Sequence, residues 1–161
     1  MEEVKMNAIE LAVLNFQEVR RRSIKLWRAL PDEWLTWKAD DEAFSFGETI
    51  RHVWTSQVYY HESLKLGRSL PHYEEPFEHD PITGVEIEIS RSVPYFEDFI
   101  SFVRSLSVEE LLARELDRSN VGYVRTYGDM LNRIAYHESV HTGQFLQSMR
   151  SAGIPRPNIW D

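Results

Sequence analysis

The sequence predicts an all-α protein, a four-helix bundle that forms one domain over residues 1–161. Three observations support this fold class. Apolar residues recur at helical spacing in long segments, serine–glutamate capping boxes stand where helices should begin, and glycine or proline stands where they should end. A chain of 161 residues with 42% hydrophobic residues can bury about two thirds of its unfolded surface. No convincing pair of strands interrupts the helical pattern.

The first helix is expected over about Val4–Leu30, where apolar residues follow a helical period. Pro31 should end it, because proline cannot continue the backbone hydrogen-bond ladder. Residues 31–44 then form a connector that carries Trp34 and Trp37. We expect these two indole rings to cover the core rather than to bind a ligand.

The second helix has the clearest boundaries in the sequence. Ser45 and Glu48 fit a capping box, in which each side chain satisfies a backbone donor near the other residue. The helix should run to Leu66, with Gly67 as its C-terminal stop. Three prolines in residues 68–82 predict a long extended connector between the second and third helices.

The third helix is expected over about Thr83–Ser105, with a kink or a later start because Pro94 lies inside it. A second capping box at Ser107 predicts an extra short helix through about Leu112. Residues 116–125 contain Asn120 and Gly122 and should form a loop or a short hairpin.

The last helix is expected over Thr126–Ala152, because Thr126 is a good N-cap and Gly153 a good C-terminal stop. The chain contains no internal repeat and no low-complexity segment. Its first residues lack a basic region followed by an apolar run, and no segment approaches 18 consecutive apolar residues. The default expectation is therefore a soluble, cytoplasmic protein.

The composition limits the partners that the protein can have. A net charge of −8 disfavours both nucleic acid and an anionic membrane surface. The one basic run, Arg20 to Arg22, lies inside a helical pattern and is expected on a solvated face. Cysteine is absent, so a metal ion would have to be held by nitrogen and oxygen ligands.

A metal-binding pattern stands in the last predicted helix, where His137, Glu138 and His141 match H-E-x-x-H. Two histidines four residues apart on a helix point from one face, with their Cβ atoms roughly 6 Å apart. In zinc peptidases the glutamate of this pattern acts as general base. That interpretation also requires a third ligand downstream, and the residues after His141 contain no histidine and only Asp161 as an acid. A zinc peptidase is therefore the weaker hypothesis.

The third ligand is expected from the second helix, which carries His52 and His61. These residues are about 900° of helical rotation apart and lie on opposite faces, so at most one of them can serve. Periodicity favours His61, which follows the apolar stripe, but spacing alone leaves the choice open. His72 and His79 lie in the proline-rich connector and are expected to be exposed.

Three motifs, in this order along the chain, resemble those of the DinB-like family. They are residues 45–52 (SFGETIRH), residues 137–144 (HESVHTGQ) and residues 152–155 (AGIP). This family of four-helix proteins includes bacillithiol-type thiol transferases and mycothiol-dependent isomerases. The resemblance covers most of residues 31–157 and implies that the metal ligands are His52, His137 and His141, and that His61 is not one of them.

The resemblance also implies an up-down-down-up bundle, a homodimer, and a metal pocket at one end of the bundle with water in the remaining positions. Three imidazole nitrogens discriminate weakly among zinc, nickel, manganese and iron, so any of these divalent ions fits. A low-molecular-weight thiol is a further expected cofactor. Glu138 is a weak candidate for a catalytic base and could instead orient a ligand or a water. Gly143 is expected to allow close packing near the site.

The sequence thus supports a divalent-metal-binding protein, with catalysis left open. The first hypothesis is a metal-dependent thiol transferase or hydrolase that acts on a small-molecule substrate. The alternatives are a stress-related metal-binding protein without catalysis and, less favoured, the H-E-x-x-H zinc peptidase. The substrate lies beyond the sequence, because a shared fold and metal do not transfer a reaction.

Overall fold

The computed structural model describes residues 6–161 and shows a helical bundle with one small sheet. The helices are α1 (Ala8–Arg28), α2 (Phe46–Leu66), α3 (Val85–Ser105), α4 (Val108–Ala113) and α5 (Tyr127–Ala152). Strands β1 (Glu115–Arg118) and β2 (Tyr123–Thr126) pair antiparallel around a 3-10 turn (Ser119–Val121). Another 3-10 turn (Asp32–Trp34) lies between α1 and α2. The expected start of the first helix at Val4 lies outside the described residues.

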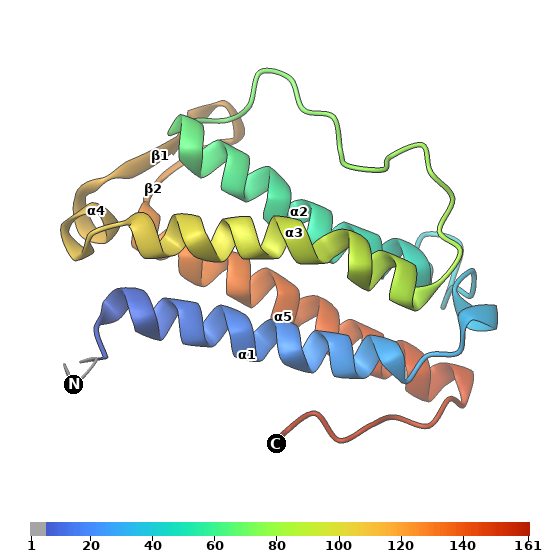
Figure 1. Cartoon of the computed structure of the whole chain (residues 1–161). Helices are drawn as coiled ribbons and strands as arrows, with labels where there is room; N and C mark the ends of the chain where they lie inside the picture. The colour runs from blue at the N-terminus through green and yellow to red at the C-terminus, as the bar shows by residue number, and fades with distance from the viewer. Residues whose placement is uncertain (1–5) are drawn as a thin grey trace.

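The four long helices run up, down, down and up, as the resemblance implied (Figure 1). Helices α2 and α3 are parallel neighbours, so the chain between them must return along the whole length of the bundle. A helix of 21 residues is roughly 32 Å long. Residues 67–84 span that distance as the irregular segment above the bundle in Figure 1, which confirms the predicted long connector.

The helix boundaries follow from the caps read in the sequence. The Ser45 hydroxyl accepts from the backbone N–H of Glu48 at 3.1 Å, and the Glu48 carboxylate accepts from the backbone N–H of Ser45 at 2.7 Å. Ser107 opens α4 with a second complete capping box. Gly67 ends α2 in the left-handed region, with φ of 79°, where a side chain would be strained.

Pro94 neither delays nor interrupts α3, which begins at Val85 and continues through the proline. Pro94 cannot donate a hydrogen bond to the carbonyl of Ser90, four residues earlier. Both residues are exposed, so water can take the place of the missing donor. Residues 116–125, expected as a loop or a short hairpin, form a hairpin with Leu116 opposite Arg125.

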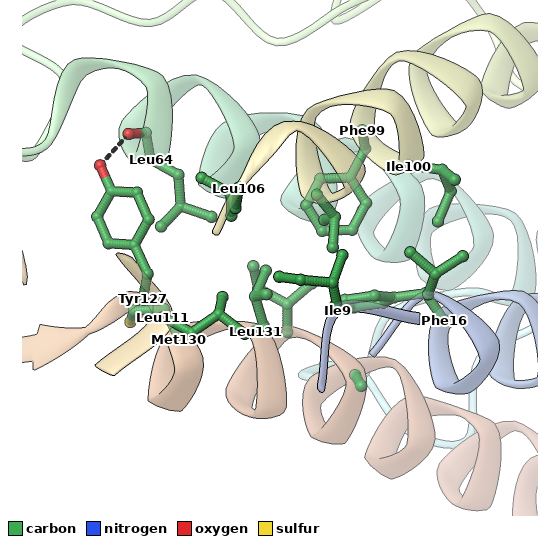
Figure 2. Packing of buried hydrophobic residues seen from close by; sticks show 14 of the residues in the cluster. Ile9, Phe16, Leu64, Phe99, Ile100, Leu106, Leu111, Tyr127, Met130 and Leu131 are labelled. Atoms are coloured by element: carbon green, nitrogen blue, oxygen red, sulfur yellow. Dashed lines mark hydrogen bonds between the residues drawn. The ribbon is translucent and has the colours of Figure 1, made fainter. Parts of the chain in front are cut away.

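The core consists of two clusters, one towards each end of the bundle. Figure 2 shows the cluster near the hairpin, where Phe16 of α1 meets Phe99 of α3 edge-to-face at 4.8 Å. In the same view the buried Tyr127 hydroxyl donates to the backbone carbonyl of Leu64, which ties the start of α5 to the end of α2. The other cluster includes Trp54 and Phe145, with Trp34 and Trp37 packed against it as expected.

A buried ion pair fixes the connector to the bundle. Arg51 of α2 forms a bidentate pair with Glu88 of α3, and Trp54 donates its indole N–H to the same carboxylate at 3.1 Å. The second terminal nitrogen of Arg51 donates to the backbone carbonyls of Phe77 and Asp80 at 2.7 and 2.8 Å. The connector therefore lies in a fixed place beside α2. None of the helices within residues 6–161 is long and apolar enough to cross a membrane.

Candidate metal centre

Three histidines from α2 and α5 converge on one another. His52 comes from the second turn of α2, and His137 and His141 come from successive turns of α5. The ring centroids are 4.6 Å apart for His137 and His141, 4.8 Å for His52 and His141, and 5.2 Å for His52 and His137. Each residue offers a nitrogen that lies within 4.8 Å of the other two. Among residues 6–161 this is the one group of three or more histidines and acids close enough to hold a metal ion.

The distances fit a small divalent cation. The Nε2 atoms of His137 and His141 face each other at 3.2 Å. Two nitrogens bound to one tetrahedral zinc ion at about 2.05 Å would be roughly 3.3 Å apart. The other ring nitrogen of His141, Nδ1, is buried without a hydrogen-bond partner among the described residues. The two α5 imidazoles thus already have the spacing that a shared metal ion requires.

The surroundings favour the neutral form of all three imidazoles, which is the form that binds metals. Burial, together with the neighbouring His141 and His52, lowers the pKa of His137 to about 4. Burial and the proximity of His141 lower the pKa of His52, against a raising contribution from Glu75. Burial also lowers the pKa of His141, and the nearby Gln144 side chain partly opposes this shift. At neutral pH the ring lone pairs are therefore available.

The remaining histidines lie away from this group. His61 is buried on the opposite face of α2, where its ring contacts Phe99 and Phe102 of α3 at 5.5 and 5.0 Å. The periodicity therefore identified a core histidine, and the motif resemblance identified the one in the site. His72 and His79 are exposed on the connector, as expected.

Glu138 faces away from the three histidines, into the bundle. Its carboxylate forms a bidentate ion pair with Arg20 of α1, with nitrogen–oxygen distances of 2.9 and 3.1 Å. The two side chains are only 8% and 4% exposed. The expectation that Arg20 lies on a solvated face is wrong, because α1 turns this one arginine of its basic run inward, where it also lies over the Phe96 ring. Charge and periodicity alone could not reveal a partner that lies on the last helix.

Several residues around the group carried no signal in the sequence. Phe44, from the loop before α2, stands 5.0 Å from the His52 ring. A cavity of about 620 Å³ opens beside His141, with Trp37 and Phe44 among its walls. Glu75, from the connector, accepts a hydrogen bond from Thr55 of α2 and lies close enough to raise the pKa of His52. Loops without periodicity place these side chains, so only the folded chain shows their position.

Comparisons with known proteins agree with this architecture. The chain is similar in structure to YfiT of Bacillus subtilis, which is described as a probable metal-dependent hydrolase with an unusual four-helix bundle topology. That match has a TM-score of 0.77 at 13% identity and covers 96% of this chain and 93% of YfiT. A DinB-like protein of Bacillus subtilis, YjoA, matches with a TM-score of 0.71 at 22% identity, over 92% of this chain and 96% of YjoA.

A DinB-like protein of Bacillus cereus matches with a TM-score of 0.71 at 18% identity, over 92% of this chain and 95% of that one. A comparison with curated proteins finds no match. The sequence profile of the DinB superfamily matches residues 15–145, a range that contains all three histidines, the whole of α2 and α5 as far as Phe145. The chain belongs to the DinB superfamily.

Proposed function

We propose that this protein binds one divalent metal ion through His52, His137 and His141, and that it is a metal-dependent hydrolase or thiol transferase acting on a small molecule. The observation that carries the proposal is the convergence of three half-buried imidazoles from two helices, with ligand atoms within 4.8 Å of one another. Zinc, nickel, manganese and iron all accept such nitrogen ligands. Three protein ligands leave coordination positions free, which is the pattern of catalytic rather than structural metal sites.

The chain's own residues supply a site that is fixed and open on one side. A bound divalent ion would act as a Lewis acid that lowers the pKa of a coordinated water or thiol. The α-helical backbone holds His137 and His141 one turn apart, and the packing of α2 against α5 brings in His52. The cavity beside His141 gives a small molecule access to the group.

The two proposed reactions differ in their nucleophile. Hydrolysis uses water, and YfiT, at 13% identity, is described as a probable metal-dependent hydrolase. Thiol transfer uses a low-molecular-weight thiol as second substrate, as the resemblance to thiol transferases suggested. A homodimer and a cytoplasmic location stay predictions from the sequence.

The other two hypotheses have less support. A metal-binding protein without catalysis would not need the cavity that opens beside His141. A peptidase of the H-E-x-x-H type would need the Glu138 carboxylate beside the metal. That carboxylate is instead hydrogen-bonded to Arg20 on both oxygens.

The test combines metal analysis with turnover. Purified protein should contain about one divalent ion per chain, and His137→Ala should lose both the ion and the hydrolysis or thiol transfer of small-molecule substrates. His72→Ala is the matched control, because it removes an exposed histidine outside the group. Turnover that persists in His137→Ala without any bound metal would refute the proposal. Metal binding without turnover of any hydrolase or thiol substrate would support the non-catalytic alternative.

A further inference from the structure

The cavity beside His141 has aromatic walls. Trp37, Phe44 and Phe46 line one side of it, and the part of α5 that follows His141 lines the other. Phe46 is buried and stacks on Trp37 with ring centroids 5.3 Å apart, so these two rings belong to the packed core, whereas Phe44 is exposed. A volume of about 620 Å³ is in the range of cavities that enclose small organic molecules.

A glycine in the α5 wall leaves part of this space open. Gly143 lies inside α5, where glycine destabilises a helix relative to alanine. The backbone there does not require glycine, since φ is positive only at Gly67, Gly122 and Gly153 among the described glycines. A Cβ atom at Gly143 would meet no described atom within 4 Å, so the expectation of close packing at this residue is wrong. At Gly128 of the same helix, by contrast, a Cβ would lie 2.9 Å from the Leu111 carbonyl oxygen.

The charges around the cavity disfavour a ligand with a negatively charged body, meaning by body the part of the ligand that does not bind the metal. Among the described residues that line it, Glu42 is the one charged side chain. A neighbouring hollow, which shares Phe44, is lined by acids of the connector and of α2 and by one cation, Arg51. Arg51 is already paired with Glu88 and with two backbone carbonyls. Among the described residues, therefore, no unpaired arginine or lysine lines either hollow. A carboxylate or phosphate on the ligand body would find no cation to bind there.

We infer that the cavity beside His141 takes the uncharged aromatic body of a small molecule whose polar group reaches the three histidines. Gly143 is a specificity-determining residue that leaves room for this body. The inference rests on the proposed metal-dependent function and names the class of substrate for it.

The experiment uses metal-loaded protein and three hydroxamates, which share one metal-binding group and differ in their bodies. Acetohydroxamate carries a methyl group, benzohydroxamate a phenyl ring, and 4-carboxybenzohydroxamate a phenyl ring with a negative charge. Calorimetry should show benzohydroxamate binding at least about 10-fold more tightly than acetohydroxamate, because the ring is buried in the cavity. The carboxylated ring should lose at least about 10-fold relative to benzohydroxamate, because its charge loses water without gaining a cation.

A variant pair tests the role of the glycine. Gly143→Leu should weaken benzohydroxamate binding at least about 10-fold, change acetohydroxamate binding less than about 3-fold, and leave the metal content unchanged. Gly143→Ala should raise the unfolding midpoint of the metal-free protein by roughly 1–3 °C, since nothing packs where the methyl group would go. Asn132→Ala, at an exposed position of α5 away from the cavity, is the control for helix propensity.

Two kinds of failure are distinguishable. Protein that takes up no metal in solution overturns the proposed function and the inference with it. Protein that holds its metal but binds the phenyl and methyl hydroxamates equally, or binds the carboxylated ring as tightly as the uncharged one, overturns the inference alone. The same holds if Gly143→Leu leaves benzohydroxamate binding unchanged.

Discussion

Replacing Glu138 by glutamine tests whether this residue is a structural partner of Arg20 or a catalytic base. The substitution keeps the side-chain shape and removes the charge. The Arg20 guanidinium, 4% exposed, would then be buried without its counter-ion. It lies over the rings of Phe96 and Trp27, which cannot replace a carboxylate as acceptor.

The expected loss of stability is large. Removing one partner of a buried ion pair costs roughly 3–5 kcal/mol, because the remaining charge stays desolvated. A domain of this size is stable by roughly 5–15 kcal/mol, so the loss is a substantial part of the total. For 161 residues it corresponds to a fall in the unfolding midpoint of roughly 10 °C. The double variant Arg20→Met/Glu138→Leu should recover most of this loss, since it removes both charges and fills the space with apolar groups.

Thermal unfolding followed by circular dichroism, with metal content measured in parallel, gives the result. Glu86→Gln is the control, because its ion pair with Arg28 is exposed and its loss should leave the midpoint unchanged. The reasoning is refuted if Glu138→Gln keeps the wild-type midpoint and metal content while turnover disappears. That outcome would make Glu138 a base and its pairing with Arg20 incidental.

Three further predictions follow from the structure. Chelation should lower the free energy of unfolding by about 2.7 kcal/mol if the free ion was at roughly 100 times its Kd. A chelator effect that survives in His52→Ala would place the metal elsewhere. Burial lowers the pKa of His61, so the unfolded chain takes up a proton near pH 6.5 before the folded one does. The free energy of unfolding should therefore fall as the pH drops from about 7 to 5. In denaturant titrations, His61→Phe should reduce the slope of this free energy against pH by at most about 1.4 kcal/mol per pH unit. Equal slopes in the wild type and the variant would contradict the burial of His61. Ser45→Ala should cost about 1 kcal/mol through loss of the capping box, and an unchanged denaturation midpoint would show that the cap contributes nothing.

The sequence predicted the helices well because residues close to each helix end determine where the helix begins and ends. Ser45 and Ser107 bond to residues three positions away, and Gly67 and Gly153 adopt the left-handed conformation that ends a helix. Such signals need no knowledge of the fold. The start of α3 was harder, because Pro94 seemed incompatible with a helix that in fact exposes the proline to solvent.

The site was predicted only in part, and the missing parts depend on long-range contacts. Two histidines four residues apart define a local pair, but periodicity favoured His61 as the third, and the family motif was needed to choose His52. The inward turn of Arg20 depends on Glu138, which lies on the opposite end of the sequence. The aromatic cavity and the position of Glu75 depend on connectors whose path is set by distant anchors such as the Arg51–Glu88 pair.

The division of the three clustered histidines between α2 and α5 also sets the order in which the proposed metal site can assemble. During synthesis His52 emerges long before His137 and His141, and those two alone offer an ion only two nitrogens. The full donor set exists only once α5 lies antiparallel to α2 in the native alignment, the one that also brings Tyr127 to the Leu64 carbonyl. Under the proposed function, tight metal capture would be a late event that reports correct pairing of these helices. The rate of ion uptake during refolding would therefore give the rate at which α5 packs against α2.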